Sequence, residues 1–317
     1  MGLTAETCRY LVKASQHGVA FKRTASLGHQ HMNVGPKTLL RLLHAEGIKP
    51  DPATTQKLLA STPEQRSGPF FQALGCETLD VLDMSGYEGA NLLWDMNQPV
   101  PEDWKAKYDV VLDGGTLEHV FNFPVAIKNV MEMVRAGGHL ILMTPCNNYC
   151  GHGFYQFSPE LLYRILSAEN GFHTKDMQLL EITAVTDAFL GLRYPFRLSR
   201  KPHTVTDPEQ IRERVELINN YPACLLVTAQ RNQTIEPLRQ PPQQSDYQPQ
   251  WTDMKVAGHR QPSAAKQKAE HCLRKLLGED FCREILPTLI GILKPWRWTV
   301  FKRRHSLSNR KWYHPHD

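Results

Sequence analysis

The feature that most constrains the fold is a regular alternation of short apolar stretches with stretches of helical periodicity. This alternation is typical of an α/β protein with a mainly parallel, doubly wound sheet. One apolar stretch, "HLILMTP", shows little polar alternation, which indicates a strand covered on both faces. The predicted strands are Arg23–Gly28, Thr78–Ser85, Ala90–Asp95, Tyr108–Asp113, His139–Pro145 and Ala223–Gln230.

Helix signals stand between these strands. Pro36 suits the first position of a helix and Gly47 its end. A second helix has apolar residues at i, i+3, i+4 and i+7 from Ile127 and is expected to stop at Gly137-Gly138. A third is predicted over 158–171, with a serine as its N-cap and a glycine as its terminator.

Four parts are predicted along the chain. Residues 1–22 form a lead-in helix, and residues 23–235 form the sheet domain. Residues 236–254 are rich in Pro and Gln and read as a linker. Residues 255–317 are expected to form a basic, helical C-terminal extension.

Charge is distributed unevenly. The net charge is +5, but residues 292–317 hold seven Lys or Arg against one Asp, which leaves the rest of the chain near −1. A near-neutral main domain argues against a nucleic-acid groove. The same stretch holds three of the six tryptophans. Three readings of this basic, aromatic tail stay open: a partner-docking segment, a peripheral contact with an anionic membrane, or a contact with single-stranded nucleic acid.

The compartment predicted from these features is the cytoplasm, with the inner face of the membrane as an added location if the tail binds lipid. No apolar run reaches the roughly 18 residues needed to span a bilayer. The first residues lack the apolar core of an export signal. Seven cysteines without a spacing framework suit a reducing compartment.

Ligands of doubly wound sheets bind beyond the carboxyl ends of the strands. An acid after the second strand is the usual device for holding ribose hydroxyls, and one after the third can accept a hydrogen bond from an adenine amine. Glycines after the fourth strand allow a ligand to approach the backbone. The candidate cofactor-binding residues at these three ends are Asp83, Met84, Asp95, Met96, Asp113, Gly114 and Gly115.

The segment "YDVVLDGGTLEHVFNFPVAIKNVMEMVRAGGHLILMTP", residues 108–145, resembles the core of class I S-adenosylmethionine-dependent methyltransferases, and within them the type 11 group. "GHGFYQFSPELLYRILSAENGF" and "QQSDYQPQW" are similar to a subset of bacterial members. The resemblance covers roughly residues 20–235. It implies a seven-stranded, Rossmann-like sheet with an antiparallel last strand, S-adenosylmethionine as cofactor, and the methionine end of that cofactor near Asp113, Gly114 and Gly115.

The loop after the first strand departs from the family pattern of an acid followed by three alternating glycines. In "SLGHQHMNVG", Gly28 matches the first glycine, Ser26 stands at the acid position, and Gln30 and Met32 stand at the later glycines. A side chain held at positive φ costs roughly 1–2 kcal/mol. Two hypotheses follow. Either Gln30 or His31 replaces a lost contact to the cofactor, or the domain has lost cofactor binding and serves as a scaffold.

Two other kinds of nucleotide-binding site are excluded because the chain lacks their sequence motifs. The chain contains no G-x-G-x-x-G motif, which a nicotinamide-binding Rossmann domain requires after its first strand. It also contains no P-loop motif. S-adenosylmethionine carries no phosphate, so its binding tolerates both absences.

Candidate catalytic residues follow from the chemistry of methyl transfer, in which the enzyme mainly positions the acceptor. An oxygen acceptor benefits from a general base, most often His. His152 is the first candidate, His119 the second, and Tyr155 is expected to orient the acceptor. Glu118 reads as a helix-start carboxylate favoured by the dipole. A zinc site through Cys146, Cys150 and His152 lacks a second ligand pair, so no metal is predicted.

The predicted function is therefore methylation of a hydroxyl or similar group on a small molecule or saccharide. The saccharide acceptor, and with it a part in polysaccharide biosynthesis, comes only from the bacterial subset that the chain resembles. The alternative is a catalytically inactive scaffold or binding protein. Nucleic acid is not expected as a partner, because the main domain lacks a basic face and the family's Asn-Pro-Pro-aromatic string is missing.

Overall fold

The computed structural model describes residues 2–62, 65–86, 88–184, 197–199, 201–247, 275, 278 and 305–316. The chain divides into two compact units. The first comprises Met1–Val205, Asn220–Pro242 and Pro315–Asp317. The described residues of the second are 206–219, 243–247, 275, 278 and 305–314.

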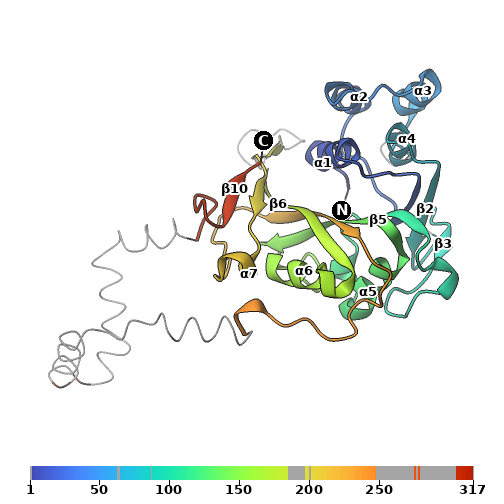
Figure 1. Cartoon of the computed structure of the whole chain (residues 1–317). Helices are drawn as coiled ribbons and strands as arrows, with labels where there is room; N and C mark the ends of the chain where they lie inside the picture. The colour runs from blue at the N-terminus through green and yellow to red at the C-terminus, as the bar shows by residue number, and fades with distance from the viewer. Residues whose placement is uncertain are drawn as a thin grey trace. The chain divides into compact units, whose positions relative to one another are not determined.

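The first unit is built on one twisted sheet (Figure 1). Its strands lie in the order β8-β6-β9-β5-β4-β1-β2-β3, and β7 pairs with β6. The five strands from β3 to β5 are parallel, whereas β9 runs antiparallel between β5 and β6. This confirms an α/β, Rossmann-like fold with an antiparallel last strand. The bounds are β1 Arg23–Leu27, β2 Thr78–Asp83, β3 Leu92–Leu93, β4 Tyr108–Asp113, β5 Val134–Asn147, β6 Phe172–Ala184, β7 Arg197–Ser199, β8 His203–Val205 and β9 Ala223–Arg231.

The prediction of seven strands is wrong, because the described residues of this unit form nine. The additional strands lie at the β6 edge, where β7 and β8 both pair antiparallel with β6. A long edge strand exposes unpaired N–H and C=O groups, and the two short strands pair with part of that edge. The strand β6 itself has 13 residues and was not among the strands predicted.

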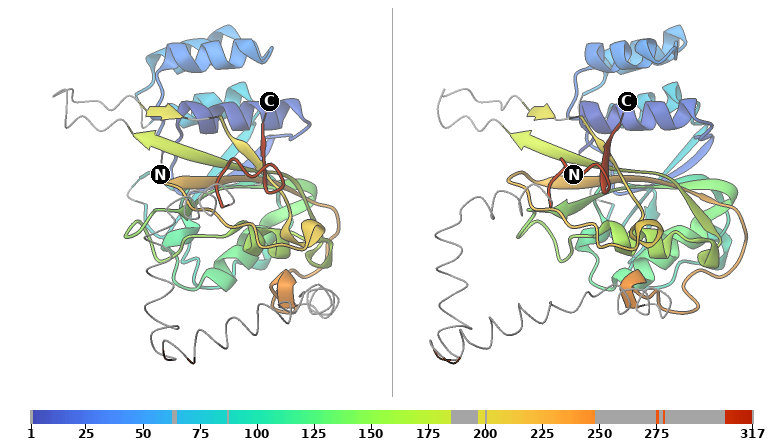
Figure 2. Two further views of the ribbon diagram at one scale, coloured as in Figure 1. Left: turned by 90° about the vertical axis from the view of Figure 1, so that its left-hand side faces the viewer. Right: turned by 60° about the vertical axis from the view of Figure 1, so that its left-hand side comes forward.

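Helices cover both faces of the sheet, as a doubly wound topology requires. Figures 1 and 2 show α1 to α4 on one face and α5 and α6 on the other. The helix expected within residues 1–22 is α1, which starts with a capping box between Thr4 and Thr7. The bounds are α1 Ala5–Gln16, α2 Pro36–Ala45, α3 Pro52–Ala60, α4 Ser67–Ala73, α5 Phe123–Met133 and α6 Pro159–Ile165.

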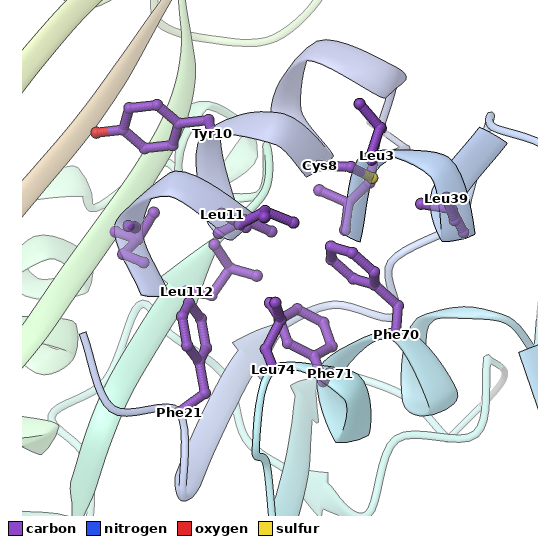
Figure 3. Close-up of a cluster of buried hydrophobic side chains, with 14 of the residues drawn as sticks. Leu3, Cys8, Tyr10, Leu11, Phe21, Leu39, Phe70, Phe71, Leu74 and Leu112 are labelled. Atoms are coloured by element: carbon purple, nitrogen blue, oxygen red, sulfur yellow. The ribbon is translucent and has the colours of Figure 1, made fainter. Parts of the chain in front are cut away.

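A continuous hydrophobic core joins the first group of helices to the sheet (Figure 3). Leu11 of α1 and Phe70 and Phe71 of α4 are fully buried in it. They share this cluster with Val110 and Leu112 of β4, the strand that leads into the candidate site. Burial of large apolar side chains, at roughly 25 cal/mol per Å² removed from water, holds the carboxyl end of β4 in place.

Two predicted helix ends differ from the structure. α5 ends at Met133, and Gly137 and Gly138 lie inside β5. The Arg231 guanidinium explains the early end, since its Nη1 donates to the carbonyls of Met131, Glu132 and Val134, acceptors that helix ends leave unsatisfied. The helix predicted over 158–171 is split into α6 and the 3₁₀ turn Ala168–Asn170, and it stops at a glycine in the left-handed region as expected.

The second unit carries the described end of the basic tail. It contains the short helix α7 (Pro208–Ile211), the 3₁₀ turn η5 (Ser245–Tyr247) and most of β10 (Tyr313–Pro315). Residues 305–316 form turns and this strand, so the helix predicted for the extension is not found in that part. Trp312 is buried there and its Nε1 donates to Glu213 (3.1 Å). The remaining tryptophans of the tail, Trp296 and Trp298, lie outside the described residues.

No helix in the described part of the chain has both the length and the apolarity needed to cross a membrane.

Candidate functional site

The carboxyl ends of β1, β2 and β4 meet at one edge of the sheet. β1 lies between β2 and β4, and its last residue, Leu27, is in register with Leu82 of β2 on one side and Asp113 of β4 on the other. The order of the strands changes direction at β1, because β2 and β3 lie on one side of it and β4 and β5 lie on the other. This is the switch point at which doubly wound sheets bind ligands.

Gly28 and Asp83 lie together at this edge. Gly28 has a φ of +67°. A Cβ on it would lie 3.2 Å from Oγ1 of Thr116 and 3.9 Å from Oδ2 of Asp83. The other oxygen of Asp83, Oδ1, accepts from the Ser85 N–H (3.1 Å). Thr116, which no pattern in the sequence indicated, lies with them, and its hydroxyl donates to the Leu27 carbonyl across the strand ends (3.1 Å).

Gln30 reaches the same place from the loop after β1. Its side chain is buried, and Nε2 donates to the carbonyls of Leu27 (3.0 Å) and Gly28 (3.4 Å). Oε1 is buried without a hydrogen-bond partner. A Cβ on Gly114 would overlap this amide, so in this position the Gln30 side chain packs directly against the glycine. We call Gly28, Gln30, Asp83 and Gly114 the glycine half of the site.

His31 and Met32, which follow Gln30 closely in the sequence, lie away from the strand ends. Met32 is 1% exposed and packs in the core, where it bridges to Leu3. His31 pairs with Glu88 at 3.5 Å in an exposed position. Gln30 therefore lies at the strand ends, whereas Met32 lies in the hydrophobic core.

Asp113 organises the turn after β4. Its Oδ1 accepts from the N–H groups of Thr116 (2.8 Å) and Leu117 (3.3 Å), while Oδ2 is buried without a partner. Gly115 takes a φ of +104° in this turn, which only glycine adopts readily. Burial raises the pKa of Asp113 to about 6, against the lowering effect of these backbone N–H groups.

The candidates after β2 and β3 are placed differently from one another. Asp95 uses Oδ1 to accept from the Asn97 N–H (2.9 Å) and Nδ2 (2.7 Å), so its carboxylate shapes its own turn. Met96 is buried, and its carbonyl accepts from Asn129 Nδ2 (3.3 Å). Met84 is 76% exposed.

The structure brings Glu118, His119 and His152 together. Nε2 of His152 lies 3.6 Å from Oε1 of Glu118, and Nε2 of His119 lies 3.9 Å from it. The two imidazole rings are 5.2 Å apart. The Glu118 side chain is fully buried, whereas the side chain of His152 is 33% exposed and that of His119 is 47% exposed. We call these three residues the histidine half of the site.

The loop after β5 is fastened to Glu118 through the backbone. The N–H groups of Phe154 (2.8 Å) and Tyr155 (3.2 Å) both donate to the Glu118 carbonyl. A Cβ on Gly153 would lie 2.8 Å from that oxygen, so only glycine fits there. These contacts fix His152 over η2 (Leu117–His119), the 3₁₀ turn that carries Glu118.

Tyr155, predicted to orient the acceptor, has another contact in this structure. Its hydroxyl donates to the Phe121 carbonyl (2.6 Å), and its ring packs with Phe123 and Phe157. The geometry therefore gives Tyr155 a part in holding the loop.

The interpretation of Glu118 as a helix-start carboxylate is wrong. η2 is three residues long and α5 begins only at Phe123, so no α-helix N-terminus faces the carboxylate. Neither oxygen has a hydrogen-bond partner from another described residue. Burial, together with the nearby charge of Asp113, raises the pKa of Glu118 to about 8. Burial and His152 lower the pKa of His119, which favours its neutral form.

The cysteines expected as the alternative zinc ligands do not take part. Cys150 is exposed, and burial raises the pKa of the Cys146 thiol to about 12, which opposes the thiolate form that metals bind. Among the described residues, one group of three metal-ligating side chains is close enough to share an ion, and it is the histidine half.

No protein-family model and no curated protein sequence matches the chain. Solved structures similar to it include S-adenosylmethionine-dependent methyltransferases. The 1,6-didemethyltoxoflavin-N1-methyltransferase of Burkholderia thailandensis, with bound S-adenosylhomocysteine, is 11% identical, with 72% of this chain and 78% of that chain covered and a TM-score of 0.36. The N-methyltransferase NodS of Bradyrhizobium japonicum is 14% identical, with 72% and 96% covered and a TM-score of 0.35. A methyltransferase of Mesorhizobium loti is 15% identical, with 72% and 98% covered and a TM-score of 0.35. The fold described above follows from strand order and direction, independently of these matches.

Proposed function

We propose that the chain is an S-adenosylmethionine-dependent methyltransferase that acts on a hydroxyl or similar group of a small molecule or saccharide. One observation carries the proposal. At the switch point of the sheet, Gly28 lies near Asp83, and the turn after β4 leads from Asp113 and Gly114 to a buried carboxylate that lies within 4 Å of two imidazoles.

The glycine half has the groups that this cofactor requires. Oδ2 of Asp83 lies near Gly28 and suits the ribose hydroxyls, which are donors. The unpartnered Oε1 of Gln30 is an acceptor, and it suits the ammonium group at the methionine end. When bound, the cofactor supplies a methyl group on a sulfonium, a carbon open to in-line displacement.

The histidine half is suited to removing a proton from the acceptor. His152 is the proposed base, and His119 stands beside it as the second candidate. A neutral imidazole accepts a proton, and the lowered pKa of His119 keeps that ring neutral near pH 7. Glu118 lies within 4 Å of both rings, and in its ionised form its carboxylate stabilises either ring when that ring becomes charged.

An aromatic pair next to the histidines supports an acceptor with an apolar face. Phe121 and Phe154 are 72% and 66% exposed, and their rings meet nearly edge to face at 5.7 Å. Each stands two residues beyond one of the histidines. The C–H face of a sugar ring or the face of an aromatic ring would pack against this pair. We propose such an acceptor.

A second candidate, a scaffold that has lost cofactor binding, is favoured by one observation. The Gln30 amide lies against Gly114, in space that glycines of this fold leave for a ligand. If Gln30 keeps this position when ligand is present, the approach to Gly114 is blocked.

Calorimetric titration with S-adenosylmethionine and S-adenosylhomocysteine tests the proposal. We expect saturable binding by the wild-type chain and a loss of roughly 10–100-fold in Asp83→Ala, the range for a hydrogen bond to a charged group. Asp103→Ala, which changes an acid of the 3₁₀ turn Glu102–Trp104 before β4, is the control and should bind as the wild type does. A folded wild-type sample that gives no heat of binding would favour the scaffold.

The location and partners are also proposals. A cytoplasmic site, a membrane or protein contact through the basic tail, and the absence of a nucleic-acid partner follow from composition and charge alone.

A further inference from the structure

We propose that Glu118, His119 and His152 form a binding site for a divalent transition-metal ion. Their ligand atoms all lie within 4.8 Å of one another. Zinc bonds of 2.0–2.2 Å in tetrahedral geometry place neighbouring ligand atoms roughly 3.4 Å apart. The distances from Glu118 Oε1 to the two Nε2 atoms, 3.6 and 3.9 Å, approach that separation before any ion is bound.

Unpartnered buried atoms point to a missing ligand. Both carboxylate oxygens of Glu118 and Nε2 of His152 are buried without a hydrogen-bond partner. Buried polar groups of native proteins are nearly always partnered, so three such atoms facing one another require an explanation. One cation between them would satisfy all three.

The charge around these residues favours a cation. Asp113 is a second buried carboxylate close enough to act on Glu118, and its Oδ2 is also unpartnered. Among the described residues, no lysine or arginine forms an ion pair with either acid. Within the described part of the chain, the two carboxylates therefore lack the lysine or arginine partner that buried acids usually have.

The ligand set indicates the class of metal. Two imidazoles and one carboxylate suit zinc, cobalt, iron(II) or manganese, whereas calcium and magnesium prefer oxygen ligands. Three protein ligands leave coordination positions open, as in catalytic rather than structural sites. His119 is 47% exposed, so these positions are accessible. An open position would bind the acceptor's oxygen or nitrogen; this role rests on the proposed function, whereas the metal site does not.

The test uses the full chain after removal of metals with a chelator. Co²⁺ is titrated while the visible d–d absorption is recorded, and Zn²⁺ is titrated by calorimetry. We expect one Co²⁺ per chain, displaced by Zn²⁺. His152→Ala, His119→Ala and Glu118→Gln should each weaken binding by more than the roughly 10–100-fold that loss of an outer-shell partner costs.

Two control variants keep the result interpretable. His44→Ala removes an exposed histidine of α2, and Cys150→Ser removes the exposed thiol of the loop that carries His152. Both should bind Co²⁺ as the wild type does. Thermal unfolding confirms that each variant is folded, and Glu118→Gln keeps the shape of the side chain.

The proposal is overturned if the folded wild type binds neither Co²⁺ nor Zn²⁺ saturably. It is also overturned if Glu118→Gln and His119→Ala bind as the wild type does, or if Cys150→Ser abolishes binding. Asp83→Ala should leave Co²⁺ binding unchanged, so failure of the metal site and failure of cofactor binding are distinguishable.

Discussion

The two halves of the site satisfy their polar groups differently. In the glycine half, one end of each polar side chain is anchored to the backbone: Gln30 Nε2 donates to Leu27 and Asp83 Oδ1 accepts from Ser85, while Gln30 Oε1 has no partner. In the histidine half, Glu118 has no hydrogen bond from another described residue. A region whose polar side chains are anchored in this way can bind a ligand with little rearrangement. A region with buried unpartnered atoms is held at a cost by the surrounding fold, as functional sites often are.

The largest effect is expected for Glu118→Gln on the pH dependence of stability. The pKa of Glu118 is raised from 4.5 to about 8, so the folded state binds this proton more tightly than the unfolded state does. The resulting stability is fully present below about pH 4.5 and is lost as pH rises through about 8. The glutamine variant cannot ionise, so it should exceed the wild type by a few kcal/mol at pH 9, on the order set by linkage.

Urea unfolding at pH 5 and pH 9, with a chelator present, measures this difference. Glu169→Gln, an exposed change on another 3₁₀ turn, is the control and should follow the wild type. Equal losses of stability in the wild type and Glu118→Gln between these pH values would show that Glu118 ionises without penalty.

The next largest effect is expected for Gly153→Ala. The new Cβ would lie 2.8 Å from the Glu118 carbonyl, a backbone atom that cannot move aside freely. We expect a loss of about 1–3 kcal/mol, the usual cost of overpacking, and weaker Co²⁺ binding because His152 is displaced. Gly68→Ala is the matched control: its Cβ meets nothing within 4 Å, and alanine in α4 should stabilise slightly. A Gly153→Ala variant as stable as the wild type would mean that the loop is not held against Glu118.

Gln30→Ala separates the two proposed functions. If the Gln30 amide contacts the cofactor, the variant should bind S-adenosylhomocysteine about tenfold more weakly, the equivalent of one hydrogen bond. If the amide blocks the site, the variant should bind more tightly than the wild type. Calorimetry decides between a fall and a rise in affinity. The opposite sign from the one expected would reverse the assignment of Gln30.

The smallest effect is expected for Asp95→Ala. Its carboxylate already accepts two hydrogen bonds from Asn97, so less of its bonding capacity is left for an adenine amine than Asp83 has for a ribose. The same titration should show only a minor loss of affinity, well below that of Asp83→Ala. A loss as large as that of Asp83→Ala would place Asp95 in direct contact with the cofactor.

The glycine half was largely predictable from the sequence, and the histidine half was not. Gly28, Asp83 and Gly114 follow directly after strands, and parallel strands bring their carboxyl ends to one edge. The isolation of Glu118 depends on Gly153 and the loop around it, a contact between distant segments that no local pattern reports. Likewise, α5 ends early because of Arg231, which lies about a hundred residues further along the chain.

A crystal structure of the chain with S-adenosylhomocysteine and Zn²⁺ tests the central claim most directly, namely that the two halves form one site. The account predicts the ribose at Asp83, the sulfur directed toward the histidine half, and the ion held by Glu118, His119 and His152. The account would be contradicted if either ligand bound away from this edge of the sheet. It would also be contradicted if neither ligand bound at this edge at saturating concentration.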